Sequence, residues 1–184
     1  LLTATIAWGN RKSIIKNSRR LMDLMDNAPY EFVISHKQSD LKAFEGFVHR
    51  TFNAQDAVQF IKSLKHIYIA HGGMESIFCK YAETNSLQYA IHKFKCYFFE
   101  IDHLKRSEKH ISDPLKNSAA KRINMFLRWM VRNDGNVDFG IWKKLKKSNL
   151  SCPLDVHTGR VARKLGLIKR KQNDLKGLIE LDKN

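Results

Sequence analysis

The sequence predicts an all-α protein of about eight helices, and three observations carry this prediction. Hydrophobic residues make up 43% of the 184 residues and proline occurs only 3 times, which is a globular rather than a disordered composition. Apolar residues recur at intervals of three and four, the spacing of one helix face, in most segments. No segment shows a convincing strand pattern.

The first helices are predicted in the N-terminal part of the chain. Residues 1–8 are apolar and predict either a buried strand or the end of a helix, which periodicity alone does not separate. Gly9 and Asn10 interrupt this pattern, and residues 11–25 predict a helix. Its inward residues are Ile14, Ile15, Leu21, Met22 and Met25, and its outward residues are Lys12, Lys16, Arg19 and Arg20.

A long helix is predicted after two short apolar segments at residues 29–36 and 39–47. Asn53 precedes it, and Asp56 lies in its first turn, where the helix dipole favours an acid. Its apolar stripe is Val58, Ile61, Leu64, Ile67 and Tyr68. The sequence His71-Gly72-Gly73 resembles the oxyanion loop of some esterases. Because the chain has no Gly-X-Ser-X-Gly motif, we assign this triplet to a helix C-terminus instead.

Further helices are predicted at residues 74–82 and 86–101, and we assign the aromatic residues of the second to the core. Residues 102–116 are charged and contain the turn signal Ser112-Asp113-Pro114, so we expect a surface loop. The remaining predictions are a turn at 134–136, a short helix at 139–145, and a last helix at 174–181 with Leu175, Leu178 and Ile179 inward.

The stretch from Ser118 to Leu167 holds the most informative pair of predicted helices. The first helix, at residues 118–132, has the apolar stripe Ile123, Phe126, Leu127 and Met130 and an outward row of Lys121, Asn124, Arg128 and Arg132. Before the second helix, Pro153 favours an extended Cys152, and Asp155 is the predicted N-cap. We expect the helix to bury the stripe Val161, Ala162 and Leu165 and to end at Gly166. Its polar face is expected to hold His157, Arg160, Arg163 and Lys164.

The charge of the chain points to a polyanionic partner. The formal net charge is +15 and the pI is about 9.9. The excess is uneven, because residues 101–184 hold 20 Lys and Arg against 9 Asp and Glu, whereas residues 1–100 hold 13 against 9. The basic half therefore contains the pair of helices described above.

Cysteine usage and hydropathy favour a cytoplasmic protein without a cofactor or metal. Cys79, Cys96 and Cys152 form no Cys-X-X-Cys pair and no zinc or iron–sulfur spacing, so we expect three reduced core thiols. No apolar run approaches the ~20 residues that a membrane span needs, and no secretory signal is visible. The chain begins within an apolar pattern and ends shortly after a helical one, so we expect a fragment of a longer protein.

The same pair of helices resembles a known superfamily. Lys121 at a helix start, followed by Pro153-Leu154-Asp155-Val156-His157 and a basic helix, resembles the helix-hairpin-helix DNA glycosylases. Leu154-Asp155-Val156-His157 is most similar to the 8-oxoguanine branch, whose pattern is Val-Asp-Val-His. The run from Ala120 to Arg132 also resembles an uncharacterised bacterial family thought to share this fold. The resemblance implies two helical lobes with a cleft between them, here residues 1–110 and 111–184.

One departure from the superfamily concerns the hairpin before the lysine. The usual Leu-Pro-Gly-X-Gly is replaced by Pro114-Leu115-Lys116-Asn117-Ser118-Ala119-Ala120, which has no glycine to take a positive φ at low cost. Asn117 tolerates a positive φ better than most residues. We therefore expect Lys116, Asn117 and Ser118 to contact a phosphate through their side chains.

The resemblance implies catalytic roles for Lys121 and Asp155 at the mouth of a base pocket. Asp155 is the carboxylate that stabilises positive charge on the sugar, and Lys121 is the nucleophile that forms a Schiff base. A helix N-terminus and the neighbouring Arg122 both disfavour added positive charge on Lys121, which favours the neutral amine that attack requires.

The expected partner is damaged double-stranded DNA in the nucleoid, with no membrane and no obligate protein partner. His157, Arg160, Arg163 and Arg122 are assigned to phosphate contacts. Trp8 and Asn10, on either side of Gly9, correspond to the loop that fills the gap left by a flipped base; alternatively, Trp8 is a core aromatic.

Two other interpretations fit the residues. Asp155 alone is an ordinary N-cap, Lys121 is one of 33 cations, and His157 is an ordinary helix surface residue. The chain is then a helical module that binds nucleic acid without cleaving a bond, or an interaction protein whose charge only solvates its surface. Salt-sensitive DNA binding separates these two interpretations, and trapping of a Schiff base identifies the enzyme.

Overall fold

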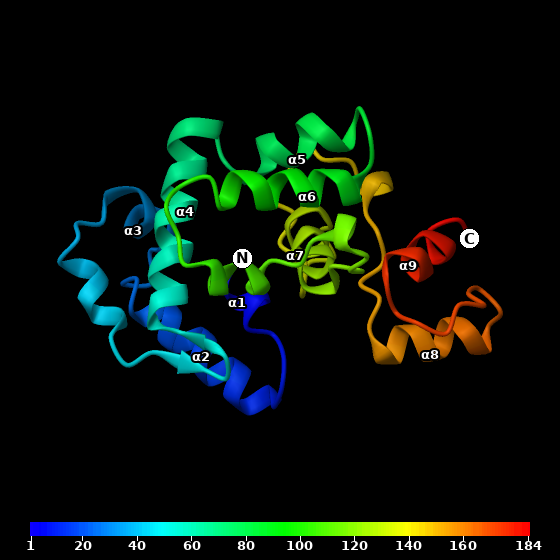
Figure 1. Ribbon diagram of the computed structural model, residues 1–184, viewed down its shortest axis with the longest axis horizontal. Helices are drawn as coiled ribbons and strands as arrows, with labels where there is room; N and C mark the ends of the chain where they lie inside the picture. Colours follow the sequence, from blue (N-terminus) through cyan, green and yellow to red (C-terminus); the bar gives the residue numbers. More distant parts are fainter. The chain divides into compact units, whose positions relative to one another are not determined.

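The computed structural model describes residues 1–184 and is built mainly from helices (Figure 1). The α-helices are α1 (Leu2–Thr5), α2 (Arg11–Asp23), α3 (Pro29–Ser35), α4 (Ala54–His71), α5 (Met74–Ala82), α6 (Leu87–Phe98), α7 (Lys121–Val131), α8 (Val156–Lys164) and α9 (Leu175–Leu181). The 3₁₀ helices are η1 (Asp40–Phe44), η2 (Lys105–His110), η3 (Pro114–Lys116) and η4 (Lys147–Asn149). Strands β1 (Val48–His49) and β2 (Phe52–Asn53) pair antiparallel as a minimal hairpin. The all-α class is confirmed.

The chain forms two compact units. The first unit is Leu1–Met74 with Cys96–His110, and the second unit is Glu75–Lys95 with Ile111–Asn184. The chain thus passes from the first unit to the second after Met74, returns to the first at Cys96, and passes to the second again after His110. The second unit carries 20 Lys and Arg against 9 Asp and Glu, so most of the net charge belongs to it.

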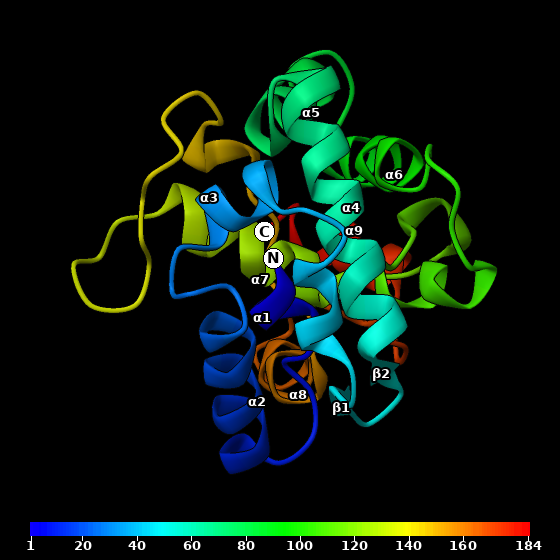
Figure 2. The ribbon, with the colours of Figure 1, turned by 90° about the vertical axis from the view of Figure 1, so that its left-hand side faces the viewer.

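The first unit is organised around α4 and an aromatic core. Figure 2 shows α3 beside α4 and the β1–β2 hairpin at the start of α4. Phe52, Phe60 and Phe98 are fully buried, with ring centroids 5.2 Å apart for Phe52–Phe60 and 4.7 Å apart for Phe60–Phe98. Residues 1–8, left open between strand and helix, contain the short helix α1.

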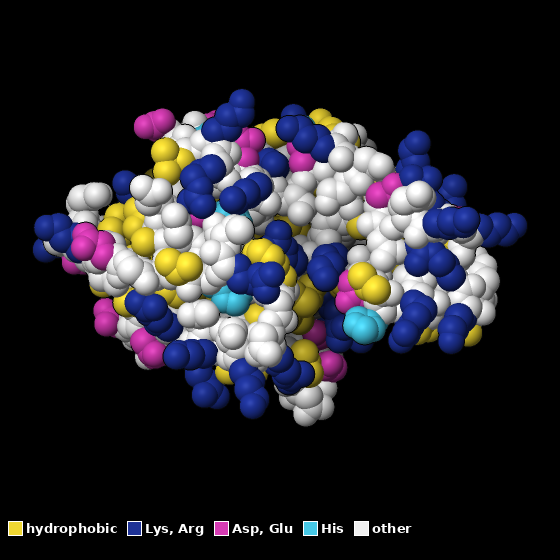
Figure 3. Space-filling model, turned by 60° about the horizontal axis from the view of Figure 1, so that its bottom comes forward, with side chains coloured by type: hydrophobic (Ala, Val, Ile, Leu, Met, Phe, Trp, Pro, Cys, Tyr) yellow, Lys and Arg dark blue, Asp and Glu magenta, His cyan; other side chains and the backbone are white.

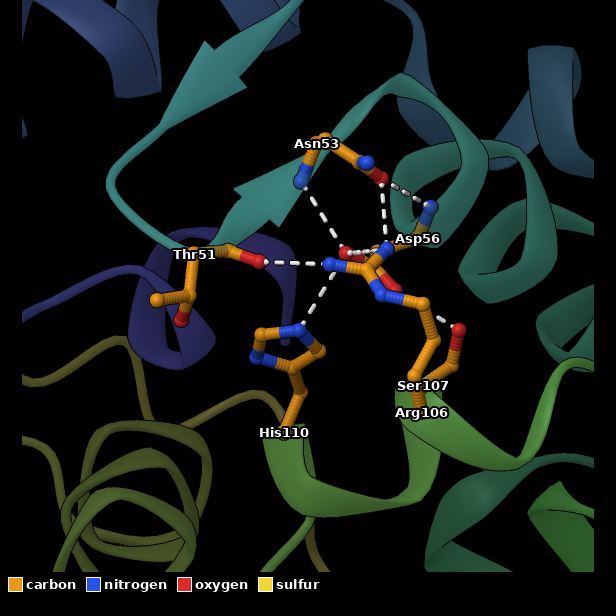
Figure 4. Close-up of polar contacts among 6 residues, drawn as sticks. All are labelled: Thr51, Asn53, Asp56, Arg106, Ser107 and His110. Carbon is orange, nitrogen blue, oxygen red and sulfur yellow. Dashed lines mark hydrogen bonds and ion pairs between the residues drawn. The ribbon is translucent and has the colours of Figure 1, made fainter.

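The N-terminus of α4 is a buried polar network (Figure 4). Asn53 is the N-cap of α4 and Asp56 lies in its first turn, as predicted; the two also form a capping box, and the Asp56 side chain is fully buried. Its carboxylate accepts from Arg106 Nη1 at 2.9 Å and from Ser107 Oγ at 2.6 Å, and His110 Nε2 lies 3.2 Å away. The network holds η2 against the start of α4.

The second unit has two apolar clusters. In one, Phe78 packs 4.9 Å from Phe94 and 5.7 Å from Trp142, measured between ring centroids. The other, which we call the hairpin cluster, joins the turn before α7 to α8 and α9 and contains Ala119, Leu154, Ala162, Ile168 and Leu178. The hairpin cluster positions the candidate site described below.

Two predicted elements were wrong. Residues 102–116 are not a surface loop, because η2 and η3 lie there and Ser107, His110 and Asp113 are buried. Residues 139–145 form no helix. Instead, the backbone N–H groups of Phe139 and Trp142 donate to carbonyls at the end of α7, those of Trp129 and Met130. These bonds replace the intrahelical bonds that a helix would need.

Several predicted burial patterns were also wrong. Val161 and Leu165 on α8 are 51% and 67% exposed, and only Ala162 of that stripe is buried. Asn124 was placed on the outer face of α7 but is buried, and its amide donates to the carbonyl of Ala119 at 2.9 Å. None of the three cysteines forms a disulfide, and Cys96 and Cys152 are exposed rather than in the core. None of the helices is both long enough and apolar enough to span a membrane.

Candidate active site around Lys121 and Asp155

Lys121 is the first residue of α7, and a turn without glycine leads into this helix. Asn117 has φ +61° and Ala120 has φ +43°, both in the left-handed region. The turn therefore adopts positive φ angles although it has no glycine, which would adopt them at low cost. They fall at Asn117 and at Ala120 instead. No side chain caps α7, and Lys121 itself is exposed.

The turn before α7 is fastened to the start of α9. The Asn117 carbonyl accepts from Leu175 N at 3.2 Å, and the Asn117 amide donates to Asp174 Oδ2 at 3.1 Å. Hydrogen bonds from Arg170 hold the pKa of Asp174 well below its ordinary value, against burial. Asn117 is thus committed to a structural contact, and Ser118 Oγ accepts from Ala120 N at 3.1 Å. Lys116 remains exposed.

Asp155 is the N-cap of α8, as its position after Pro153 predicted. Its Oδ1 accepts from Thr158 N at 2.8 Å. Burial is the largest single influence and raises the pKa of Asp155. The pKa is lowered by the hydrogen bonds from Thr158, by the positive charge of Lys121 and by the His157 N–H, and together these outweigh burial. The net pKa of Asp155 lies below its ordinary value, so the carboxylate stays ionised at neutral pH.

The two predicted catalytic residues both lie close in sequence to members of the hairpin cluster. Ala119 lies two residues before Lys121, Leu154 lies one residue before Asp155, and both are buried in this cluster. The start of α7 and the start of α8 therefore both border the hairpin cluster. The charge of Lys121 acts on the carboxylate of Asp155.

The predicted phosphate-binding residues have unequal environments. His157 and Arg160 are exposed on α8, and Figure 3 shows Lys and Arg side chains spread over the part that carries α8 and α9, at the right of the view. Arg122 is half-buried, and this burial lowers its pKa. Arg163 donates to the carbonyl of Arg170 at 2.8 Å and to Asn173 Oδ1 at 2.6 Å, so its guanidinium holds the loop before α9.

Asn173 is a site residue that the sequence did not reveal. Its amide donates to the Asp155 carbonyl at 2.9 Å, and its carbonyl oxygen accepts from Arg163. A Cβ at Gly159 would collide with Asn173 Oδ1, so this glycine lets α8 approach the loop. Gly159 lies inside a helical pattern and away from either end, and a glycine in such a position can indicate a close contact of this kind.

Trp8 and Asn10 belong to the first unit. Asn10 is the N-cap of α2, accepting from Lys12 N at 2.9 Å. Trp8 is half-buried, and the Arg50 guanidinium lies 4.4 Å from its ring centroid. Gly9 between them has φ +101°, and a Cβ there would lie 2.8 Å from Arg50 Nη1. Arg50 and Gly9 thus hold the Trp8 ring in place.

Comparison with protein families gives one match. A family model described as a protein of unknown function, DUF2400, matches residues 1–184. The chain belongs to the DUF2400 family. It matches no curated protein and no solved structure.

Proposed function

We propose that this DUF2400 protein is a DNA repair glycosylase with strand-nicking activity that excises a modified base, such as an oxidised purine. One observation carries the proposal: an ionised, helix-capping Asp155 lies within the electrostatic reach of Lys121 at the start of the next helix. The resemblance of Pro153-Leu154-Asp155-Val156-His157 to the helix-hairpin-helix glycosylases is independent support.

Asp155 has the properties needed to promote loss of a base. Breaking the bond at the anomeric carbon develops positive charge on the sugar ring, and a rigid carboxylate beside that carbon stabilises this charge. The hydrogen bond from Thr158 N fixes the position of the carboxylate. Its lowered pKa keeps it negative at neutral pH.

Lys121 takes the second role in this proposal. Its amine nitrogen attacks the anomeric carbon as the glycosidic bond breaks, and the base leaves with the bonding electrons and is protonated. Ring opening then gives a protonated Schiff base, from which loss of a C2′ proton expels the 3′ phosphate. Lys121 is exposed, so an extruded nucleotide can reach it.

The basic surface of α8 supports binding to the DNA backbone. His157 and Arg160 are exposed on the first turns of α8, the helix that Asp155 caps. Cations in such positions neutralise phosphates without reading sequence, so affinity falls with added salt. DNA bound along α8 would thus run past the proposed catalytic pair.

Borohydride trapping tests this proposal. The chain is incubated with duplexes containing an abasic site or 8-oxoguanine, and reduction converts any Schiff base into a stable covalent adduct. We expect an adduct with the parent protein and none with Lys121→Ala. Lys42→Ala is the control, because Lys42 is an exposed lysine to which no DNA contact is assigned and this variant should keep the adduct.

A base-release assay with Asp155→Asn completes the test. We expect this variant to bind the duplex but to release base at least about a hundredfold more slowly. Salt-sensitive binding without adduct or base release from the parent protein would refute the enzyme and favour a non-catalytic nucleic-acid-binding module.

A further inference from the structure

Two histidines and a glutamate converge on one point in the first unit, outside the proposed active site. His66 lies on α4, His71 is the last residue of α4, and Glu100 follows the end of α6 by two residues. The Nε2 atoms of His66 and His71 lie 2.7 Å and 2.8 Å from the same oxygen, Glu100 Oε2, and 3.3 Å from each other. We call these residues the His–Glu cluster.

The spacing of the two ring nitrogens is that of zinc ligands. Nitrogens bound about 2.05 Å from a tetrahedral zinc ion lie about 3.3 Å apart. The Nε2–Nε2 separation in the His–Glu cluster is 3.3 Å. The carboxylate oxygen is closer than a zinc ligand would be, but Glu100 is half exposed and lies outside a helix, so its side chain can withdraw by the half-ångström needed.

The chemistry of the three donors also fits a metal ion. For Glu100 Oε2 to accept from both rings, two N–H groups must point into the same small space, where they repel each other. A divalent cation instead accepts one lone pair from each ring and one from the carboxylate.

The ring of His71 is supported on two sides. The Tyr97 ring centroid lies 4.4 Å from that of His71, and the His66 ring meets it edge-on at 5.1 Å. Gly72, in the left-handed region at φ +68°, ends α4 directly after His71. The two imidazoles are therefore held in place by packing, which lowers the entropic cost of binding an ion.

We propose that His66, His71 and Glu100 bind a divalent transition-metal ion, best matched by zinc, with the fourth position open to water. The side chains are 27%, 22% and 50% exposed, so an ion can enter from solvent. The ion fastens the end of α4 to the start of the segment 96–110. The end of that segment is fastened to the start of α4 by Arg106, Ser107 and His110, so the site closes the first unit at a second point.

Zinc titration of the complete chain tests this site. After chelator treatment and dialysis, the protein is titrated with Zn²⁺ by calorimetry, and Co²⁺ is used as a spectroscopic substitute. We expect one equivalent to bind, a visible spectrum of tetrahedral cobalt, and a rise in Tm with zinc. His66→Gln, His71→Gln and Glu100→Gln should each weaken binding by at least about tenfold.

A second His–Glu pair of the same unit provides the control. His103 Nε2 lies 3.5 Å from Glu108 Oε1, is similarly exposed, and has no third ligand. His103→Gln and Glu108→Gln should leave zinc affinity unchanged. Absence of stoichiometric zinc binding by the parent chain would overturn the proposal, as would unchanged affinity in a folded Glu100→Gln variant or equal losses in the control variants.

Discussion

At the level of single residues, two carboxylates that cap helices are kept ionised by different surroundings. Asp56 is fully buried and is compensated by Arg106, His110 and Ser107, which lie fifty or more positions away in the chain. Asp155 is half-buried and is compensated mainly by Thr158, three residues on. The first carboxylate therefore supports the fold, whereas the second is available for chemistry.

Removing the charge of Asp56 should destabilise the protein strongly. Asp56→Asn leaves Arg106 and His110 without their buried counter-charge, and we expect a loss of about 3 kcal/mol or more in the free energy of unfolding. Urea denaturation followed by circular dichroism measures this change. The exposed Glu45→Gln should stay within about 0.5 kcal/mol of the parent protein.

The contribution of Asp56 to the free energy of unfolding should also depend on pH. Burial raises the pKa of Asp56, but the hydrogen bonds from Ser107 and Asn53 and the charges of His110 and Arg106 lower it below its ordinary 3.8. The resulting stability is present above pH 3.8 and is lost as the pH falls through the lower pKa of the folded state. This fall in the free energy of unfolding at low pH should be missing in Asp56→Asn. If the variant lost stability at low pH as the parent protein does, the role given to Asp56 would be contradicted.

Substitutions of Asp155 should separate helix capping from charge. Asparagine caps a helix about as well as aspartate, so Asp155→Asn should change the free energy of unfolding by only a few tenths of a kcal/mol. Asp155→Ala should cost about 1 kcal/mol. Thermal unfolding measures both, and base release should fall in both variants alike. Full activity in Asp155→Asn would mean that the carboxylate is only a cap.

Helix caps were predictable from the sequence because their signals are local. The cap at Asn53, with Asp56 in the first turn, and the cap at Asp155 were both predicted, because each cap binds a backbone group only three positions away in the sequence. The partners of Asp56 were not, because they come from residues 106–110. The His–Glu cluster was invisible for the same reason, and its five-residue spacing on α4 is not the three- or four-residue spacing of a shared helix face.

At the level of elements, the entry into α7 contains a strained backbone. Ala120 is buried and has φ +43°, which costs a non-glycine residue about 1–2 kcal/mol. Ala119, its neighbour, is also buried but has no positive φ. The two alanines therefore form a matched pair that differs in backbone strain.

Glycine substitutions at these alanines should have different effects. Ala119→Gly removes a buried methyl group and gains no relief, so it should lower the free energy of unfolding by about 1 kcal/mol. Ala120→Gly loses a similar methyl group but removes the strain, so it should be about 1–2 kcal/mol more stable than Ala119→Gly. Denaturant unfolding compares them, and equal stabilities would contradict the strain.

Elements with long periodic patterns were predicted well, and those fixed by distant contacts were not. The bounds of α5 match residues 74–82, and α4 begins directly after Asn53. Residues 139–145 carry apolar residues, but their backbone bonds to the end of α7 decide their conformation. The face of α8 was misjudged because Gly159 and Ala162, the smallest residues of the helix, make its buried contacts.

For the whole molecule, the excess of positive charge on the second unit bears on the DNA binding proposed above. Arg160 is exposed on α8, whereas Arg163 on the same helix is engaged with Arg170 and Asn173. Two arginines three residues apart therefore have separate tasks, one toward solvent and one within the fold.

The salt dependence of DNA binding should distinguish these arginines. Arg160→Gln should reduce the slope of log K against log salt by about 1 and leave Tm unchanged. Arg163→Gln should lower Tm, because it breaks hydrogen bonds that hold the loop before α9. Fluorescence anisotropy at several salt concentrations, with thermal unfolding, measures both. A slope unaffected by Arg160→Gln would remove α8 from the DNA contact.

The discontinuous first unit also bears on how the chain emerges from a ribosome. Asp56 cannot meet Arg106, Ser107 or His110 until about fifty further residues have been synthesised. When residues 106–110 emerge from the exit tunnel, residues 75–95, which belong to the second unit, have already emerged, because they come earlier in the chain. During translation the first unit therefore stays incomplete, and the Asp56 carboxylate stays hydrated, until residue 110 has emerged from the ribosome.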